Sequence, residues 1–179
     1  MSELKGQSSD NEAKEVLVTQ RKVFRAIPEL CTGCGICELL CSLSKTGVVN
    51  PYLARIRVSC SSEDGSCNVV LCRHCTVALC KDACPVPEAM YVDEATGAVV
   101  IDEASCIGCL ACADACPFGA IQIGPNREVL KCDLCGGDPV CVKYCPARPA
   151  DQFPHMPYPR TSCLEYVEPH RVTRKRIEV

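Results

Sequence analysis

Cysteine placement constrains this chain more than any other feature. Sixteen of its nineteen cysteines fall into four runs of four, and the last three runs are each followed directly by proline. The runs are Cys31, Cys34, Cys37 and Cys41; Cys72, Cys75, Cys80 and Cys84; Cys106, Cys109, Cys112 and Cys116; and Cys132, Cys135, Cys141 and Cys145. Aromatic residues are scarce in the 179 residues (Phe 3, Tyr 5, Trp 0). A fold with so thin an apolar core needs crosslinks or metal.

Disulfides are the first explanation to weigh. They are typical of secreted chains, but the first thirty residues contain no apolar signal segment, and an odd cysteine count leaves one thiol over. No apolar run approaches the roughly 20 residues of a membrane span. We therefore expect a reducing, cytoplasmic setting without a membrane span, and metal in place of disulfides.

The spacing CxxCxxC favours [4Fe-4S] clusters. Three such thiolates converge on one cluster, while a fourth cysteine, after three intervening residues, reaches a neighbouring cluster. Proline suits the end of the loop, because its fixed φ fits the first turn of a following helix. Sixteen thiolates are enough for four clusters. Zinc is the rival metal, but two CxxC pairs complete a zinc site and leave the other cysteines and the prolines unexplained.

The segment between the second and third runs predicts how the runs share clusters. Residues Ala89–Asp93 and Ala98–Asp102 read as short strands around a turn at Glu94–Gly97, which is how a bacterial ferredoxin links its two motifs. Those two runs are then expected to exchange their last cysteines, and by elimination so are the outer runs. The expected sites are site 1 (Cys31, Cys34, Cys37, Cys145), site 2 (Cys132, Cys135, Cys141, Cys41), site 3 (Cys72, Cys75, Cys80, Cys116) and site 4 (Cys106, Cys109, Cys112, Cys84).

The expected fold class is α+β, with two nested ferredoxin-like units of short hairpins and short helices. A second hairpin is expected at Ala120–Ile123 and Glu128–Leu130, and further strands at Arg55–Val58 and Asn68–Leu71. Helices are expected to begin near Cys37 and near two of the prolines, Pro85 and Pro117. Because thiolate ligation requires the metal, the chain without clusters should be largely disordered.

The expected domain limits follow from this nesting. A flexible segment covers 1–22, and the four-cluster domain covers 23–146. Within it, 68–130 form the inner unit, and 23–67 with 131–146 form the outer unit. Residues 147–179 read as a proline-rich, extended arm that ends in a basic tail.

Two motifs carry a resemblance to a known family. CRHCTVALCKDACP and KCDLCGGDPVCVKYCP resemble the iron–sulfur electron-transfer subunits of molybdenum and tungsten oxidoreductases, over about Leu30 to Pro146. The compact size and CTGCGICELLCS are most similar to the small subunit of tungsten aldehyde oxidoreductases and of benzoyl-CoA reductases. The resemblance implies four [4Fe-4S] clusters, a large tungsten or molybdenum catalytic partner, and a flavin- or NAD-linked subunit or a soluble ferredoxin as a further partner. One departure is Ser42, which stands where the other runs have proline.

The chain itself lacks the motifs of an enzyme. It has no GxGxxG, Walker loop or HExxH, so we expect a non-catalytic relay of single electrons. A formal charge of −3 without a basic stripe argues against nucleic-acid binding. The alternatives are a self-assembling multi-cluster filament, a stand-alone polyferredoxin, and a zinc-stabilised interaction module.

Three cysteines and one histidine remain outside these assignments. Cys60, Cys67 and Cys163 are expected to be free thiols, with an extra metal site or a redox pair at Cys60 and Cys67 as the alternative. His74 lies inside the second run. It either tunes a cluster by hydrogen bonding or is simply exposed on the loop.

Overall fold

The structure is a computed structural model that describes residues 21–146 and 162–168. The described strands are β1 (Val23–Ala26), β2 (Arg57–Cys60), β3 (Cys67–Val70), β4 (Met90–Val92), β5 (Val99–Ile101), β6 (Gln122–Ile123), β7 (Val129–Leu130) and β8 (Leu164–Val167). The helices are α1 (Ile36–Thr46), α2 (Leu79–Asp82), α3 (Ala111–Asp114) and α4 (Val140–Lys143), with 3₁₀ turns at Pro28–Leu30, Pro51–Leu53, Pro87–Ala89 and Leu134–Gly137. This is the small α+β ferredoxin-like fold expected from the sequence.

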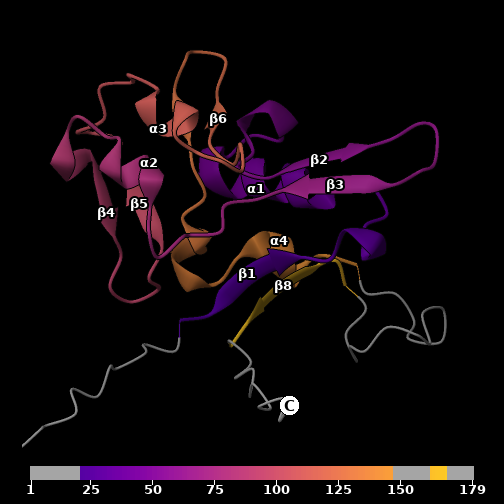
Figure 1. The fold of residues 1–179 in the computed structure, drawn as a ribbon. Coiled ribbons are helices and arrows are strands. Elements are labelled where there is room, and N and C mark those ends of the chain that lie inside the picture. The colour runs from indigo at the N-terminus through magenta and orange to yellow at the C-terminus, as the bar shows by residue number, and fades with distance from the viewer. Residues whose placement is uncertain (1–20, 147–161, 169–179) are drawn as a thin grey trace, which may run out of the picture.

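The strands form antiparallel pairs, each a two-stranded sheet. Three are hairpins, β2–β3, β4–β5 and β6–β7, and the fourth joins β1 to the distant β8. Figure 1 shows β4, β5, α2 and α3 together at one side of the molecule, with α4 and the β1–β8 ribbon below them and the β2–β3 hairpin projecting at the other side. Every sheet is small, so the cysteine-bearing segments between the sheets make up much of the interior.

Two apolar clusters follow the nested arrangement. One gathers residues of β1, α1, α4 and β8, and it includes Leu30, Ile56 and Leu164. The other gathers residues around β4 and β5, and it includes Met90 and Val99. Cysteines of the outer runs pack into or against the first cluster, and cysteines of the inner runs pack into or against the second.

The predicted hairpins are confirmed, with shifted or shortened ends. Strands β4 and β5 pair from Met90↔Ile101 to Val92↔Val99, and β6 pairs with β7. Asp93 accepts hydrogen bonds from the backbone N–H (2.8 Å) and the hydroxyl (2.5 Å) of Thr96, which shape the turn between β4 and β5. Strands β2 and β3 lie at 57–60 and 67–70, so toward the turn this ladder reaches two residues further on β2 and one residue further on β3 than the sequence predicted.

The prediction that helices begin at the prolines is wrong. Helices α2, α3 and α4 lie inside the cysteine runs and end before Pro85, Pro117 and Pro146. A residue before proline is disfavoured in helical conformation, and proline itself lacks the N–H that a continuing helix needs. Proline therefore stops these helices, while Pro117 lies in a turn and a 3₁₀ turn begins two residues after Pro85.

Helix α1 shows what happens where no proline follows the run. It begins near Cys37 as expected, and it continues for 11 residues because Ser42, not proline, follows Cys41. The fully buried Ser42 hydroxyl donates to Leu39 O (2.9 Å) and accepts from Asn50 N (3.0 Å). The helix ends at Gly47, which adopts a left-handed conformation and donates to Leu43 O.

Strand β8 was not predicted from the sequence. It pairs with β1 from Val23↔Val167 to Ala26↔Leu164, across more than 130 intervening residues. Arg25 lies directly opposite the buried Glu165 and donates to its carboxylate from Nε (2.8 Å) and Nη2 (2.7 Å). The predicted flexible segment and most of the predicted arm and basic tail lie outside the described residues, and the domain limits stay predictions.

Candidate metal centres

The loops of the cysteine runs have an unusual backbone. Left-handed φ values occur at Gly33, Gly35 and Gly108, and also at residues other than glycine, namely His74, Leu110, Leu134 and Cys135. Alternation of right- and left-handed residues turns successive N–H groups toward one concave side, an arrangement found around phosphates and iron–sulfur clusters. Each run then places its third cysteine in the short helix that follows. The loops thus suit an anionic group that thiolates hold.

The four cysteines of site 3 line one cavity of about 250 Å³. Cys72, Cys75 and Cys80 come from the second run, and Cys116 comes from the end of the third run. The remaining lining is mostly apolar, with Val77, Leu79 and Ile121 among it, together with basic side chains discussed next.

Two polar side chains at this cavity have the character expected beside an iron–sulfur cluster. The buried His74 accepts a hydrogen bond at Nδ1 from Val99 N (3.1 Å), so in the neutral ring the proton is on Nε2. Nε2 is buried and has no hydrogen-bond partner among the described residues. Burial, together with the nearby Lys131 ammonium, lowers the pKa of His74 to about 3, which keeps the ring neutral. His74 thus has a free N–H donor available for a sulfur acceptor, and the exposed-loop alternative for it is wrong.

Lys131 is the second of these side chains. It is 7 % exposed, and its Nζ donates to Cys72 Sγ (3.4 Å), Val99 O and Cys132 O. A buried ammonium that contacts a thiol is expected where negative charge gathers on sulfur.

Site 1 brings together cysteines from the two ends of the outer unit. Cys31, Cys34, Cys37 and Cys145 line a narrow cavity of about 20 Å³, whose walls include Val58 of β2 and Val69 of β3. A fifth cysteine, Cys163, lines the same cavity and is 3 % exposed. The sequence predicts a free thiol at Cys163 but not its place beside site 1, because nothing in the segment TSCLEYVE indicates that it returns to the first run.

Site 4 also gathers around a cavity. Cys84 of the second run and Cys106, Cys109 and Cys112 of the third line a small cleft of about 10 Å³. Met90, Ile101 and Val129 complete its apolar wall. Sites 3 and 4 therefore exchange their last cysteines in space, in the pattern expected for the inner unit.

Three of the four cysteines of site 2 lie in or against the core between α1 and α4. Cys41 and Cys141 are buried, and Cys132 packs against the same cluster. Cys41 Sγ accepts from Arg55 N (3.2 Å), and Cys132 Sγ accepts from Leu134 N (3.4 Å). Backbone N–H donors to sulfur are the contacts that stabilise thiolate ligands.

The pKa shifts of the thiols indicate the same groups of neighbouring cysteines. Burial raises the pKa of Cys141 well above its usual value, and neighbouring thiolates at Cys132, Cys41 and Cys135 raise it further. Burial also raises the pKa of Cys37 to about 12, with contributions from Glu38, Cys34 and Cys145. Thiols crowded in this way cannot all ionise without cations among them. A bound iron–sulfur cluster would supply that charge, since a thiol that coordinates a metal ion is deprotonated outright.

Interactions between the runs also indicate which sites are neighbours. Cys37 of site 1 raises the pKa of Cys141 of site 2. Burial raises the pKa of Cys132 of site 2 to about 12, and Cys72 of site 3 raises it further. Helices α2 and α3, which carry cysteines of sites 3 and 4, pack against each other. Lys131 Nζ contacts both Cys72 Sγ of site 3 and the backbone of Cys132 of site 2, and α1 carries one cysteine each of sites 1 and 2, so successive sites are neighbours in the fold.

The free-thiol prediction is wrong for Cys60 and Cys67, which form a disulfide. They lie directly opposite each other at the turn end of the β2–β3 ladder. Ser61 N donates to Ser66 O (2.8 Å) at the next position, so the cysteines occupy a non-hydrogen-bonded pair, where facing residues approach most closely. Extending the expected hairpin by two residues would have revealed this pairing. Cys163 forms no disulfide, and its assignment as a free thiol stays a prediction.

Within residues 21–146 and 162–168, no helix has the length and apolar character needed to cross a membrane. In the same residues, no three His, Cys, Asp or Glu side chains form a group suited to a metal ion.

Comparison with known proteins places these features in a family. Residues 66–152 match the 4Fe-4S dicluster domain, and residues 28–47 match a 4Fe-4S binding domain. The polyferredoxin-like subunit of the aliphatic sulfonate oxidoreductase of Pyrococcus furiosus is 44% identical over 129 residues, which cover 72% of this chain and 73% of that protein. An uncharacterised ferredoxin of Methanocaldococcus jannaschii is 40% identical over 66% of this chain and 64% of its own length.

More distant relatives were also found. Formate hydrogenlyase subunit 2 of Escherichia coli is 31% identical over 66% of this chain and 75% of its own length. Among solved structures, the BamBC active-site complex of benzoyl-coenzyme A reductase contains a chain with 22% identity and a TM-score of 0.45, covering 83% of this chain and 77% of that one. From the sequence relatives and the domain matches, the chain belongs to the polyferredoxin-like family of [4Fe-4S] dicluster proteins, the iron–sulfur electron-transfer subunits of oxidoreductase complexes.

Proposed function

We propose that this chain relays single electrons through four [4Fe-4S] clusters, one at each of sites 1–4. The observation that carries the proposal is the meeting of cysteines that are far apart in sequence. Cys145 shares a cavity with Cys31, and Cys116 shares one with Cys72. A row of four redox centres in a chain without catalytic motifs suits conduction and not substrate chemistry.

The protein's own groups would hold and tune the clusters. Thiolates supply the ligands, and the left-handed loops and Cys-directed N–H groups favour added negative charge. His74 and Lys131 would raise the potential at site 3, because a donor and a cation stabilise the reduced form. A bound [4Fe-4S] cluster supplies reversible one-electron chemistry.

The proposed partner is a large tungsten- or molybdenum-dependent catalytic subunit of the aldehyde oxidoreductase type. The support is the resemblance of the run spacings to the small subunits of such enzymes, and the similarity to a subunit of an aliphatic sulfonate oxidoreductase. A flavin- or NAD-linked subunit, or a soluble ferredoxin, would exchange electrons at the other end of the row.

Metal analysis and native purification test this proposal. Protein prepared without oxygen should contain about sixteen iron and sixteen sulfide ions per chain. Purification under native conditions should retain a catalytic subunit with tungsten or molybdenum. Zinc in place of iron would refute the cluster assignment. An isolated chain that forms long filaments with no catalytic subunit would refute the partner.

A further inference from the structure

The Cys60–Cys67 disulfide lies against the first cysteine loop. A Cβ placed on Gly33 would be 2.7 Å from Cys60 Sγ and 3.3 Å from Cys67 Sγ. Gly33 stands between Cys31 and Cys34, two of the cysteines of site 1, so only a residue without a side chain leaves room for the disulfide there. The β2–β3 hairpin also supplies Val58 and Val69 to the wall of the site 1 cavity. The disulfide therefore adjoins site 1.

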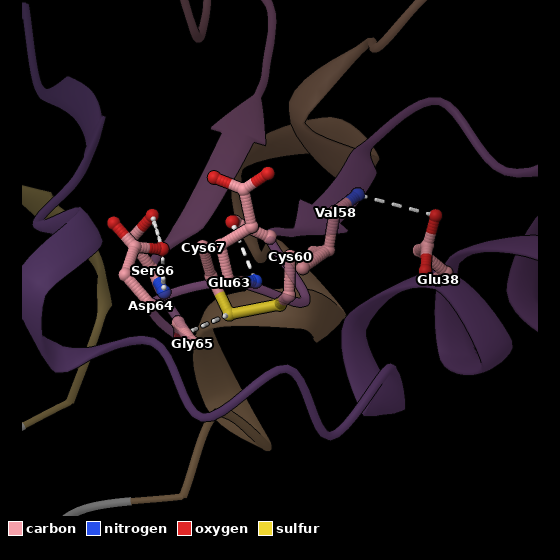
Figure 2. Close-up of a disulfide and its surroundings, with 9 residues drawn as sticks. Glu38, Val58, Cys60, Glu63, Asp64, Gly65, Ser66 and Cys67 are labelled. Atoms are coloured by element: carbon pink, nitrogen blue, oxygen red, sulfur yellow. Dashed lines mark hydrogen bonds between the residues drawn. A yellow bond between two sulfur atoms is a disulfide. The ribbon is translucent and has the colours of Figure 1, made fainter.

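The hairpin holds the two cysteines together without help from the disulfide bond. The β2–β3 ladder runs over four residue pairs, with Cys60 and Cys67 as the last pair. Beyond it, Ser66 N donates to Asp64 Oδ1 (3.0 Å) and Gly65 N donates to Ser61 O (3.1 Å). Figure 2 shows the turn folded back beside the two sulfur atoms, with Val58 N donating to Glu38 of α1 (3.3 Å). Two thiols in this frame stay adjacent and can close again.

The disulfide is also open to solvent on one side. Cys60 is exposed and Cys67 is partly exposed, while their other side contacts Gly33. Protons can reach the sulfur atoms from water, and electrons can reach them from site 1. The bond closes a loop with a sequence separation of only seven residues, and such a short loop gains the least stability from a crosslink.

We propose that Cys60 and Cys67 form a second kind of redox centre, a reducible disulfide that exchanges an electron pair with the iron–sulfur cluster at site 1. The S–S bond takes up two electrons, delivered one at a time by the reduced cluster, and two protons from water, and it becomes two thiols. Reoxidation returns both electrons to the cluster and both protons to solvent. The centre thus couples one-electron carriers to a two-electron store. This inference rests on the proposed function, since it needs a cluster at site 1.

An anaerobic electron count tests the proposal on the full chain with its clusters. The protein is first oxidised with thionin and then titrated with a reduced one-electron viologen dye. After acid quenching, thiols are alkylated and mapped by peptide mass. The wild type should take up about two more electrons per chain than the Cys60→Ser/Cys67→Ser double variant. Both should carry the same iron, and alkylation at Cys60 and Cys67 should appear only after reduction.

A matched pair of glycine variants tests the route. Gly33→Ala and Gly35→Ala strain the same loop, since both residues have left-handed φ. Only the alanine at 33 would meet the disulfide, because nothing lies within 4 Å of a Cβ at 35. New thiols at Cys60 and Cys67 should therefore appear more slowly in Gly33→Ala than in Gly35→Ala, at equal cluster reduction.

The outcomes separate this inference from the proposed function. Full iron with equal electron uptake in wild type and double variant would overturn the disulfide centre and leave the relay intact. The disulfide centre would also be overturned, with the relay intact, if thionin treatment forms no disulfide between Cys60 and Cys67. The same conclusion would follow if a strong dithiol reduces the disulfide but the viologen dye does not. Equal rates in the two glycine variants would overturn the route from site 1. Protein without iron would refute the proposed function itself.

Discussion

Removal of the buried positive charge at Lys131 should lower the reduction potential of the cluster proposed for site 3. The Lys131 Nζ lies 3.4 Å from Cys72 Sγ and is shielded from solvent. Reduction adds one negative charge to the cluster, and the ammonium stabilises that charge. Lys131→Met keeps the length of the side chain and deletes only the charge and its hydrogen bonds.

The size of the effect follows from Coulomb's law. At 3.4 Å and an effective dielectric constant of about 20, two unit charges interact by about 5 kcal/mol, or about 200 mV for one electron. This is an upper limit, because the added electron spreads over the cluster. At about twice the distance the interaction falls to about 100 mV, which is the expected drop. The variant should also lose about 1–3 kcal/mol of stability, since Val99 O loses a buried donor.

A redox titration followed by electron paramagnetic resonance measures the drop. Lys143→Met is the matched control, because the Lys143 side chain is 58% exposed and pairs with Asp138 at 3.6 Å. Solvent and salt screen that charge, so its removal should leave every potential unchanged. A Lys131→Met protein with full iron content and a site 3 potential within about 20 mV of wild type would refute the electrostatic reasoning.

Four further predictions follow from the fold. Cys145→Ser should remove about 4 of about 16 iron atoms and change the paramagnetic signal of site 1. The control Cys163→Ser, at the same cavity, should keep all the iron. Loss of the site 2 signal in Cys145→Ser would contradict the crossed ligation. Cys116→Ser should likewise damage site 3 and spare site 4, read by the same spectroscopy. Ser42→Pro should lower the free energy of unfolding by about 3 kcal/mol or more in a denaturant titration, because proline would end α1 early. The control Ser42→Ala should lower it by about 1–3 kcal/mol, because Asn50 N loses its acceptor. Equal losses in the two variants would show that the length of α1 does not depend on the absence of proline at position 42. Removal of iron by a chelator should abolish the circular dichroism of the folded chain, and a retained spectrum would show that the apolar clusters suffice alone.

Local signals in the sequence were enough for much of the fold. The β4–β5 and β6–β7 hairpins follow from short β-branched runs around turn residues. The spacing of the cysteine runs and the hairpin between the second and third runs were enough to expect that distant cysteines meet, as Cys116 and Cys72 do at one cavity; the four ligand sets stay predictions. These features depend on residues close in sequence, or on a repeated chemical pattern.

Other features could not be predicted, because a residue favours two local structures at once or because its partner is distant in sequence. Proline is favoured both in the first turn of a helix and just after a helix end, and the crowding of the residue before it decided for the end. Strand β8 lies far from β1 in sequence. Its buried Glu165 is stabilised by the Arg25 guanidinium opposite, and nothing in the sequence near Glu165 indicates this partner. A redox pair at Cys60 and Cys67 was only the alternative to free thiols, because the expected strands stopped short of both cysteines.

The pairing of β1 with β8 sets an order of events during synthesis. Cys31, Cys34 and Cys37 leave the ribosome early, but Cys145 follows more than 100 residues later, and β8 later still. The inner runs, in contrast, are complete once Cys116 has emerged. Cofactor loading on a growing polypeptide would therefore begin at sites 3 and 4 and finish at site 1, so a truncated product would lack site 1 first.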